Sequence, residues 1–375
     1  MSFTPGLAGV IAAESSISSI DGQNGVLRYR GIRIEELAEQ SSFEEVAYLL
    51  LNGGLPTETQ LGEFDARLRA HRAVPEGIIT LLKSLPDTAH PMVALQSAVS
   101  ALAAYFPHFE VEDEVANEEA VIRMIACFPT IVAAHDRIRK GLDAIAPDTS
   151  LDHAGNFLYM LNGLQPNEQQ RKIIDAALIL HAEHGFNAST FTARVVGSTM
   201  ANPYGSVSAA VGSLSGPLHG GANERVLHML GEIDGVDGVE PWFTQAQEES
   251  RKIMGLGHRV YKVKDPRATV LQGMARDLFN TEGSTPLYDM AVRLEQIAKE
   301  RIGEKGIAPN VDFYSGLVYQ KLGMEVDLFT PFFGIARIAG WGAHWIEQLK
   351  NNRIYRPTQK YVGETDARYI PMTDR

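Results

Sequence analysis

Several polar residues stand at positions where they could do chemistry. The stretch 251–267 (RKIMGLGHRVYKVKDPR) carries six cations against one acid, in a chain with a formal net charge of −12. Such a local reversal of charge indicates a site for a small anionic ligand, although a solvated basic helix face is the alternative. Within this stretch, Gly255 and Gly257 permit close backbone approach to a ligand, and Tyr261 offers an aromatic surface among the cations.

Arg337 is a second candidate because it lies on the apolar side of a strongly hydrophobic segment. It precedes Trp341 by four residues and Trp345 by eight. A buried guanidinium must be paired, because burying it alone costs several kcal/mol. An internal salt bridge or a snorkelling side chain would satisfy it. The functional alternative is a clamp that binds a substrate carboxylate through two hydrogen bonds.

His219 and Asp312 each stand next to a helical pattern. His219 directly precedes Gly220-Gly221, and the positive end of the helix that follows would lower its pKa and keep it neutral. A neutral imidazole can donate a hydrogen bond to a carbonyl oxygen and so stabilise an enol, whereas a packed loop histidine is the alternative. For Asp312, an N-cap aspartate is the ordinary explanation.

The common cofactor and catalytic motifs are absent or incomplete. No GxxxxGK[ST] phosphate loop occurs, and GLGHRV at 255–260 lacks the last glycine of GxGxxG. GSLSG at 212–216 has leucine where a nucleophile elbow needs serine. HAEH at 181–184 separates its histidines by three residues, whereas the zinc-protease motif separates them by four. We therefore expect no metal site.

The elements that must position these side chains are predicted to be mostly helices. Apolar residues recur at helical spacing in three long segments, 171–184, 289–302 and 331–350. Gly185 is predicted to end the first helix, and Pro331 is predicted to be the first residue of the third. The acidic stretch 110–119 is predicted to be a solvated helix start or loop. Strand-like alternation is scarce, with one weak candidate at 25–30 (GVLRYR).

The composition limits the classes of protein to consider. The length of 375 residues predicts two or three domains, and 45% hydrophobic with 21% charged residues is typical of a globular protein. The acidic balance argues against nucleic acid as a partner. Arg123 and Pro129 interrupt the most apolar segment, so no membrane span is predicted. Cys127 is the only cysteine, which excludes an intrachain disulfide. We expect a cytoplasmic location.

Taken together, these segments resemble the citrate synthase family nearly end to end. The resemblance rests on residues 6–38, HPM at 90–92, HAEHGFNAST at 181–190, GPLHGGANE at 216–224, GLGHRVYKVKDPR at 255–267, NVDFYSG at 310–316 and FGIARIAGW at 333–341. The three motifs GPLHGGANE, GHRVYK followed by DPR, and NVDFYSG are highly specific in this order.

The resemblance implies a mainly α, homodimeric fold with the active site in a cleft between two helical domains. The large domain would comprise residues 1–217 and 325–375, and the small one residues 218–324. The implied reaction condenses acetyl-CoA with oxaloacetate and water to citrate and CoA, through an enol(ate) and citryl-CoA. No cofactor or metal is implied, since the CoA thioester is a substrate. One alternative is a 2-methylcitrate synthase that uses propionyl-CoA, and another is a catalytically silent CoA-binding scaffold.

The resemblance also implies roles for individual residues. His219 would polarise the thioester carbonyl, Asp312 would remove the methyl proton, and His258 would be the acid at the oxaloacetate carbonyl. The carboxylates would be held by His184, Arg267, Arg337 and, supplied by the partner subunit, Arg356. Coenzyme A would contact Lys252, Ile253, Met254, Gly255, Leu256, Arg259 and Lys262.

Overall fold

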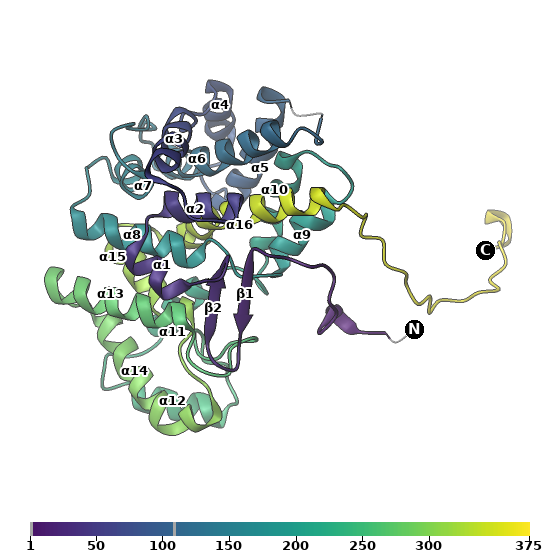
Figure 1. Ribbon diagram of the computed structural model, residues 1–375. Coiled ribbons are helices and arrows are strands. Elements are labelled where there is room, and N and C mark those ends of the chain that lie inside the picture. Colours follow the sequence, from purple (N-terminus) through teal and green to yellow (C-terminus); the bar gives the residue numbers. More distant parts are fainter. Residues whose placement is uncertain (1–2, 108–109) are drawn as a thin grey trace.

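The computed structural model describes residues 3–107 and 110–375 and is built mainly from α-helices, which confirms the predicted fold class (Figure 1). Three short strands near the N-terminus, β1 (Ser18–Asp21), β2 (Val26–Tyr29) and β3 (Ile32–Arg33), form an antiparallel sheet in that order. The sequence predicts the middle strand alone, because β1 is mostly polar and β3 has two residues, too few to show a pattern.

Most of the fold consists of the first ten helices and the last long one. These are α1 (Ile34–Gln40), α2 (Phe43–Asn52), α3 (Glu58–Ala70), α4 (Glu76–Ser84), α5 (Pro91–Tyr105), α6 (Glu114–Arg139), α7 (His153–Asn162), α8 (Glu168–His181), α9 (Ala188–Gly197), α10 (Pro203–Leu214) and α16 (Phe329–Lys350). Helix α16 is buried along most of its length and packs against α2, α5, α6, α8, α9 and α10. It is therefore the central element around which the other helices bury their apolar faces.

The remaining long helices gather at one end of the molecule (Figure 1). They are α11 (Ala222–Gly231), α12 (Val239–Glu248), α13 (Pro266–Glu282), α14 (Pro286–Ile302) and α15 (Val311–Lys321). Helices α11 and α13 pack on α15, and α12 packs on α14. Four 3-10 turns complete the described elements: η1 (Pro5–Leu7), η2 (Gly303–Lys305), η3 (Val326–Leu328) and η4 (Met372–Asp374). The domain division at 218 and 324 stays a prediction.

Three predicted helix ends can be compared with the structure. Asp113 caps α6, so the predicted helix start within 110–119 is confirmed. The predicted stop at Gly185 is wrong, because α8 ends at His181 and Gly185 lies in the following turn with φ +59°. The prediction for Pro331 is also wrong, because α16 begins two residues earlier. Proline is tolerated there because N–H groups of the first helical turn have no partner within the helix.

Both ends of the chain leave the body of the fold as extended segments (Figure 1). The C-terminal segment exposes large apolar side chains, namely Ile354, Tyr361, Val362, Tyr369, Ile370 and Met372. Within the described residues, no helix combines the length and the apolar content that crossing a bilayer would require.

The contact between α16 and α6 makes a prediction about stability. A Cβ at Gly342 of α16 would lie 2.2 Å from Val121 Cγ1, so Gly342→Ala must push the two helices apart. We expect urea denaturation to show a loss of about 1–3 kcal/mol in the free energy of unfolding. Gly334→Ala, in the same helix, is the control. A Cβ at Gly334 would lie 3.5 Å from Leu95 Cδ2, which is an ordinary contact distance. Equal stabilities for the two variants would contradict this packing.

Candidate active site

One cavity of ≈ 980 Å³ brings together predicted site residues from distant parts of the chain. The residues of the predicted set that line it are His184, His219, His258, Arg267, Asp312 and Arg337, together with Arg259. They belong to the loop after α8, the loops before α11 and α13, and the helices α13, α15 and α16. The cavity therefore collects imidazoles, guanidinium groups and one carboxylate over a shared volume.

His219 lies in the turn between α10 and α11, but its ring meets the N-terminus of α9. The backbone N–H of Ser189, in the first turn of α9, donates to His219 Nε2 over 3.2 Å. This N–H has no partner within its own helix, so it is available to the imidazole. The Ser189 hydroxyl oxygen also lies 2.8 Å from Nε2. Since the backbone N–H can only donate, Nε2 is assigned as the acceptor and the proton of the neutral ring as the one on Nδ1. Burial, and next the charge of Arg337, lowers the pKa of His219 to about 4.

His258 is held by its own loop in the opposite tautomer. The backbone N–H groups of Val260 and Tyr261 donate to His258 Nδ1 over 3.0 and 3.2 Å. Nδ1 is thus an acceptor, and Nε2 carries the proton of the neutral ring. Burial, and next the charge of Arg267, lowers the pKa of His258 to about 4. Both imidazoles are therefore neutral hydrogen-bond donors near pH 7.

Asp312 is the second residue of α15 and is not its cap. The cap is Asn310, whose Oδ1 accepts from the Asp312 backbone N–H over 3.0 Å, so the N-cap interpretation of Asp312 is wrong. Its carboxylate is left to line the cavity. Burial raises the pKa of Asp312 to about 6, although the charge of Arg267 opposes the shift. Such a carboxylate is a stronger base than an exposed aspartate.

Two loops pair side by side and hold the segment before His258 against the N-terminus of α15. The Asn310 N–H donates to Gly255 O over 2.9 Å, and the Gly257 N–H donates to Ala308 O over 2.8 Å. Asn310 Nδ2 also donates to Gly257 O over 2.8 Å. Gly255 has φ +76°, and a Cβ there would lie 2.8 Å from a side chain of α15. These glycines therefore serve the pairing of the two loops, which the sequence does not reveal.

Arg267, in the first turn of α13, has a carboxylate partner of its own. Its Nε and Nη2 donate to the two carboxylate oxygens of Asp265 over 3.1 and 2.8 Å. The Val311 N–H at the start of α15 donates to the same carboxylate over 3.3 Å. Burial alone would lower the pKa of Arg267, but the charge and hydrogen bonds of Asp265 raise it above its usual value. Asp265 thus fixes the guanidinium and ties α13 to α15.

Arg337 is buried without such a partner. Its Nε donates to His181 O over 2.6 Å, and its guanidinium lies 4.6 Å from the centre of the Phe333 ring. It forms no ion pair with any residue that the structure describes, and it is 1% exposed, so neither the salt bridge nor the snorkelling alternative holds. Burial lowers the pKa of Arg337 to about 10, with Glu183 the charge that most offsets it. A buried cation beside a cavity favours an anionic ligand.

His184 approaches the 255–267 loop through a hydrogen bond. Its Nε2 lies 3.1 Å from the Tyr261 hydroxyl oxygen. Burial, and next the charges of Arg267 and Arg337, lowers the pKa of His184 well below its usual value. Tyr261 is 2% exposed, so the predicted aromatic surface among the cations is wrong. The solvated helix face considered for this segment is also wrong, because the residues before α13 form a loop.

The other predicted residues are placed differently. Arg259 is exposed at the cavity wall. The remaining residues predicted to bind coenzyme A, which are Lys252, Ile253, Met254, Gly255, Leu256 and Lys262, lie outside the lining, and Gly255 and Leu256 are buried. Arg356 is exposed in the C-terminal segment, away from the cavity of its own chain. The roles of these residues stay predictions.

The sequence alone assigns no role to three residues that hold the site. Ser189 and Asn310 act through backbone groups at helix ends, and Asp265 caps α13 and holds the Arg267 guanidinium. Their place just before or within a first helical turn is the one feature that could have indicated them. The lowered pKa of His219 comes first from burial and next from the charge of Arg337, and the helix terminus that its ring contacts is that of α9, not that of α11.

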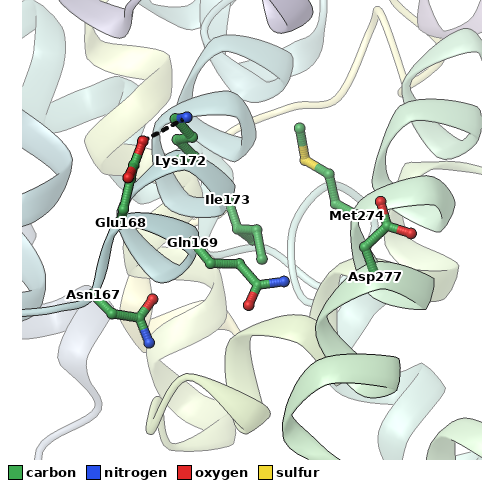
Figure 2. Close-up of a pocket in the computed structure, with 7 residues that line it drawn as sticks. All are labelled: Asn167, Glu168, Gln169, Lys172, Ile173, Met274 and Asp277. Atoms are coloured by element: carbon green, nitrogen blue, oxygen red, sulfur yellow. Dashed lines mark ion pairs between the residues drawn. The ribbon is translucent and has the colours of Figure 1, made fainter.

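A second hollow of ≈ 620 Å³ lies between α8 and α13 and contains none of the predicted site residues (Figure 2). Glu168 and Lys172 on its α8 side form an ion pair of 2.7 Å, while Met274 and Asp277 face them from α13. Its charges are exposed and already paired on one side, so it lacks the buried groups of the first cavity.

Within residues 3–107 and 110–375, no group of three or more His, Cys, Asp or Glu side chains is arranged to hold a metal ion. The two histidines of HAEH contact tyrosines instead, His181 at 2.6 Å from Tyr319 Oη and His184 at 3.1 Å from Tyr261 Oη.

A helical fold with a cavity lined by neutral imidazoles, guanidinium groups and a basic carboxylate is suited to binding small anions and moving protons on them. Comparison with known proteins assigns the chain to a family. The family model described as citrate synthase, C-terminal domain, matches residues 6–358. The chain therefore belongs to the citrate synthase family, a family of enzymes.

Individual relatives cover the whole chain. A citrate synthase of Synechocystis sp. is 53% identical over 373 residues, which are 100% of this chain and 94% of that protein. The crystal structure of citrate synthase from Pyrobaculum aerophilum has 40% identity and a TM-score of 0.92, covering 99% of this chain and 95% of that one. Citrate synthase from Thermoplasma acidophilum, in a ternary complex with carboxymethyl coenzyme A and oxaloacetate, has 33% identity and a TM-score of 0.92, covering 98% of each chain.

The raised pKa of Asp312 predicts how stability depends on pH. The pKa rises from 3.8 to about 6 because the charged form is desolvated in the fold. The aspartate therefore favours folding at low pH, and this contribution is lost as the pH rises through about 6. We expect Asp312→Asn to raise the free energy of unfolding by up to ~3 kcal/mol at pH 8 and to change it little near pH 3.5. A variant that is less stable than the wild type at pH 8 would contradict this.

Proposed function

We propose that this chain condenses acetyl-CoA with oxaloacetate and water to give citrate and CoA. The observation that carries the proposal is the convergence of three imidazoles, three guanidinium groups and one carboxylate on a single cavity, in a member of the citrate synthase family. The relatives reported above are all named citrate synthases, so nothing here favours the propionyl-CoA alternative.

The first step is removal of a proton from the thioester methyl group. The Asp312 carboxylate takes the proton, and the electron pair moves into the thioester carbonyl, whose oxygen becomes an enolate. A thioester methyl is a very weak acid, so this oxygen must be stabilised as its charge develops. His219 has its proton on Nδ1 because Nε2 is engaged by the Ser189 N–H, and it can therefore donate to that oxygen.

The second step forms the carbon–carbon bond. The enolate carbon attacks the ketone carbon of oxaloacetate, and the ketone oxygen receives a proton from His258 Nε2–H. The proton that Asp312 took from the methyl group balances the one that His258 gave up, so both side chains return to their starting forms before the next turnover. The tautomer required for this is the one that the Val260 and Tyr261 N–H groups impose on His258. Hydrolysis of the citryl thioester then releases CoA, and no cofactor is needed besides the two substrates.

Oxaloacetate is a dianion, and the cationic side of the cavity suits its two carboxylates. Arg337 lacks an ion-pair partner among the described residues, so a substrate carboxylate would supply the missing counter-charge. Arg267, oriented by Asp265, and His184 provide further donors that align the substrate for attack. Coenzyme A would lie along 252–262, with Arg259 at the cavity wall near its phosphates.

The enol must be shielded from water, so the site should assemble only when oxaloacetate is bound. His258, Arg267 and Asp312 lie in the proposed small domain, 218–324, while His184 and Arg337 lie in the proposed large one. Closure of the small domain on the large domain around oxaloacetate would bring these side chains together on the substrate.

A thiol-release assay with both acyl-CoA substrates tests the function. We expect rapid release with acetyl-CoA plus oxaloacetate, about 10- to 200-fold slower release with propionyl-CoA, and no effect of a chelator. Asp312→Asn should lower kcat at least about 1,000-fold while circular dichroism stays unchanged. Faster turnover of propionyl-CoA would make the chain a 2-methylcitrate synthase. Binding of CoA without thiol release would make it a scaffold.

We also propose that the protein works as a homodimer in which Arg356 completes the site of the partner subunit. The apolar side chains exposed along 351–375 have no surface of their own chain to cover them, and a second copy would bury them. Arg356 lies in this segment and outside the lining of its own cavity.

A hybrid dimer tests this arrangement. Two differently tagged chains, one with Arg356→Gln and one with Asp312→Asn, are co-expressed and the hybrid is purified. If Arg356 acts across the interface, one site carries both lesions and the other carries none, so about half of the wild-type rate remains. If Arg356 serves its own subunit, both sites are damaged and the hybrid is inactive. The two parent homodimers are the controls and should both be nearly inactive.

A further inference from the structure

Tyr261 stands between two imidazoles of the cavity and contacts both. Its ring centre lies 4.8 Å from that of His258 and 5.6 Å from that of His184, and the two histidine rings are 5.5 Å apart. The Tyr261 N–H donates to His258 Nδ1 over 3.2 Å, while its hydroxyl lies 3.1 Å from His184 Nε2. One residue therefore connects the loop that carries His258 to the segment after α8.

The same loop rests on the turn between β1 and β2. The Lys262 N–H donates to Gly22 O over 2.8 Å. A Cβ at Gly22 would lie 2.3 Å from the backbone oxygen of Val260, and a Cβ at Gly25 would lie 2.7 Å from Val263 Cγ2. The turn thus leaves no room for a side chain at either glycine, and the loop lies directly on its backbone.

We propose that Tyr261 is a positioning residue of the oxaloacetate site, whose hydroxyl donates to His184 Nε2 while its loop is seated on the Gly22 turn and so places the proton of His184 on Nδ1. The proposal rests on the role of His184 proposed above. Seating of the loop then prepares His258 and His184 together, because both tautomers depend on residue 261.

The direction of this hydrogen bond follows from what each nitrogen must do. A neutral imidazole has one N–H, and only a nitrogen that carries hydrogen can donate to a carboxylate. With Nε2 occupied by the tyrosine, Nδ1 is the nitrogen left to meet the substrate. If Nε2 held the proton instead, Nδ1 would present a lone pair to the carboxylate, which is repulsive. The Tyr261 hydroxyl is the donor that the structure describes at His184 Nε2, and it favours the tautomer with the proton on Nδ1.

Tyr261→Phe removes the hydroxyl and keeps the ring. We expect the KM for oxaloacetate to rise about 10-fold, with the KM for acetyl-CoA and the melting temperature nearly unchanged. In ¹⁵N-histidine-labelled protein, the His184 nitrogens should show one N–H tautomer in the wild type and a mixture in the variant. Tyr204→Phe is the matched control, since Tyr204 is a buried tyrosine whose hydroxyl bonds Arg123 outside the cavity.

A second pair of variants tests the seat of the loop. Gly22→Ala must lift the loop from the turn, so we expect kcat/KM for oxaloacetate to fall by a factor of about 10 or more. The backbone at Gly22 is not left-handed, so alanine strains no turn geometry there. Gly54→Ala is the control, because a Cβ at Gly54 meets no atom within 4 Å.

The outcomes separate this proposal from the proposed function. His184→Ala is measured in parallel. If it raises the KM for oxaloacetate while Tyr261→Phe behaves like Tyr204→Phe, the role of Tyr261 is overturned and that of His184 stands. If His184→Ala also leaves the KM unchanged, the proposed oxaloacetate site fails as well. An unchanged tautomer in Tyr261→Phe, or a Gly22→Ala enzyme as active as Gly54→Ala, would likewise overturn the proposal.

Discussion

The structure depends on one costly feature, a guanidinium buried in the central helix without a carboxylate bonded to it. Arg337 sits among the aromatic residues of α16, where burial lowers its pKa to about 10. Natural proteins rarely keep such a charge in the interior unless it is paired. Here no bonded carboxylate among the described residues offsets the cost of burying the Arg337 charge, and an anionic substrate would supply the missing counter-charge. The free energy withheld from folding is thereby available for binding.

The second constraint is that each imidazole must offer a chosen nitrogen to the cavity. Backbone N–H groups achieve this for two of them. The Ser189 N–H at the start of α9 donates to His219 Nε2, and the Val260 N–H donates to His258 Nδ1. Backbone N–H groups can only donate, so they fix the tautomer more firmly than a side chain that can also accept. His219 and His258 are neutral because burial disfavours a charged ring and because Arg337 and Arg267, respectively, repel a further positive charge.

Asp265 shows how the site is connected to the helices that carry it. Its carboxylate caps α13, orients Arg267 and accepts from the first N–H of α15. The paired loops that begin with Gly255 add a second link between the same regions. The residues at the start of α13 and α15 are therefore held as one unit, which suits a site whose parts must approach the substrate together.

The sequence predicted the helical class and the seven residues that meet at the cavity, because helical spacing and the specific motifs are local patterns. It could not predict β1, which is mostly polar, or β3, which has only two residues. Nor could it predict the contact of His219 with α9, which joins segments 30 residues apart. It also misplaced the cap of α15, because Asn310 and Asp312 are both good capping residues and the backbone geometry decides between them.

The most direct test of the buried charge is to compare Arg337→Gln with the wild type in two measurements on the same protein. Calorimetry gives the affinity for oxaloacetate, and denaturation without ligand gives the free energy of unfolding. We expect the affinity to fall about 100-fold or more while the stability is unchanged or higher. A variant that binds oxaloacetate normally and is less stable would show that Arg337 serves the fold, and it would contradict the account.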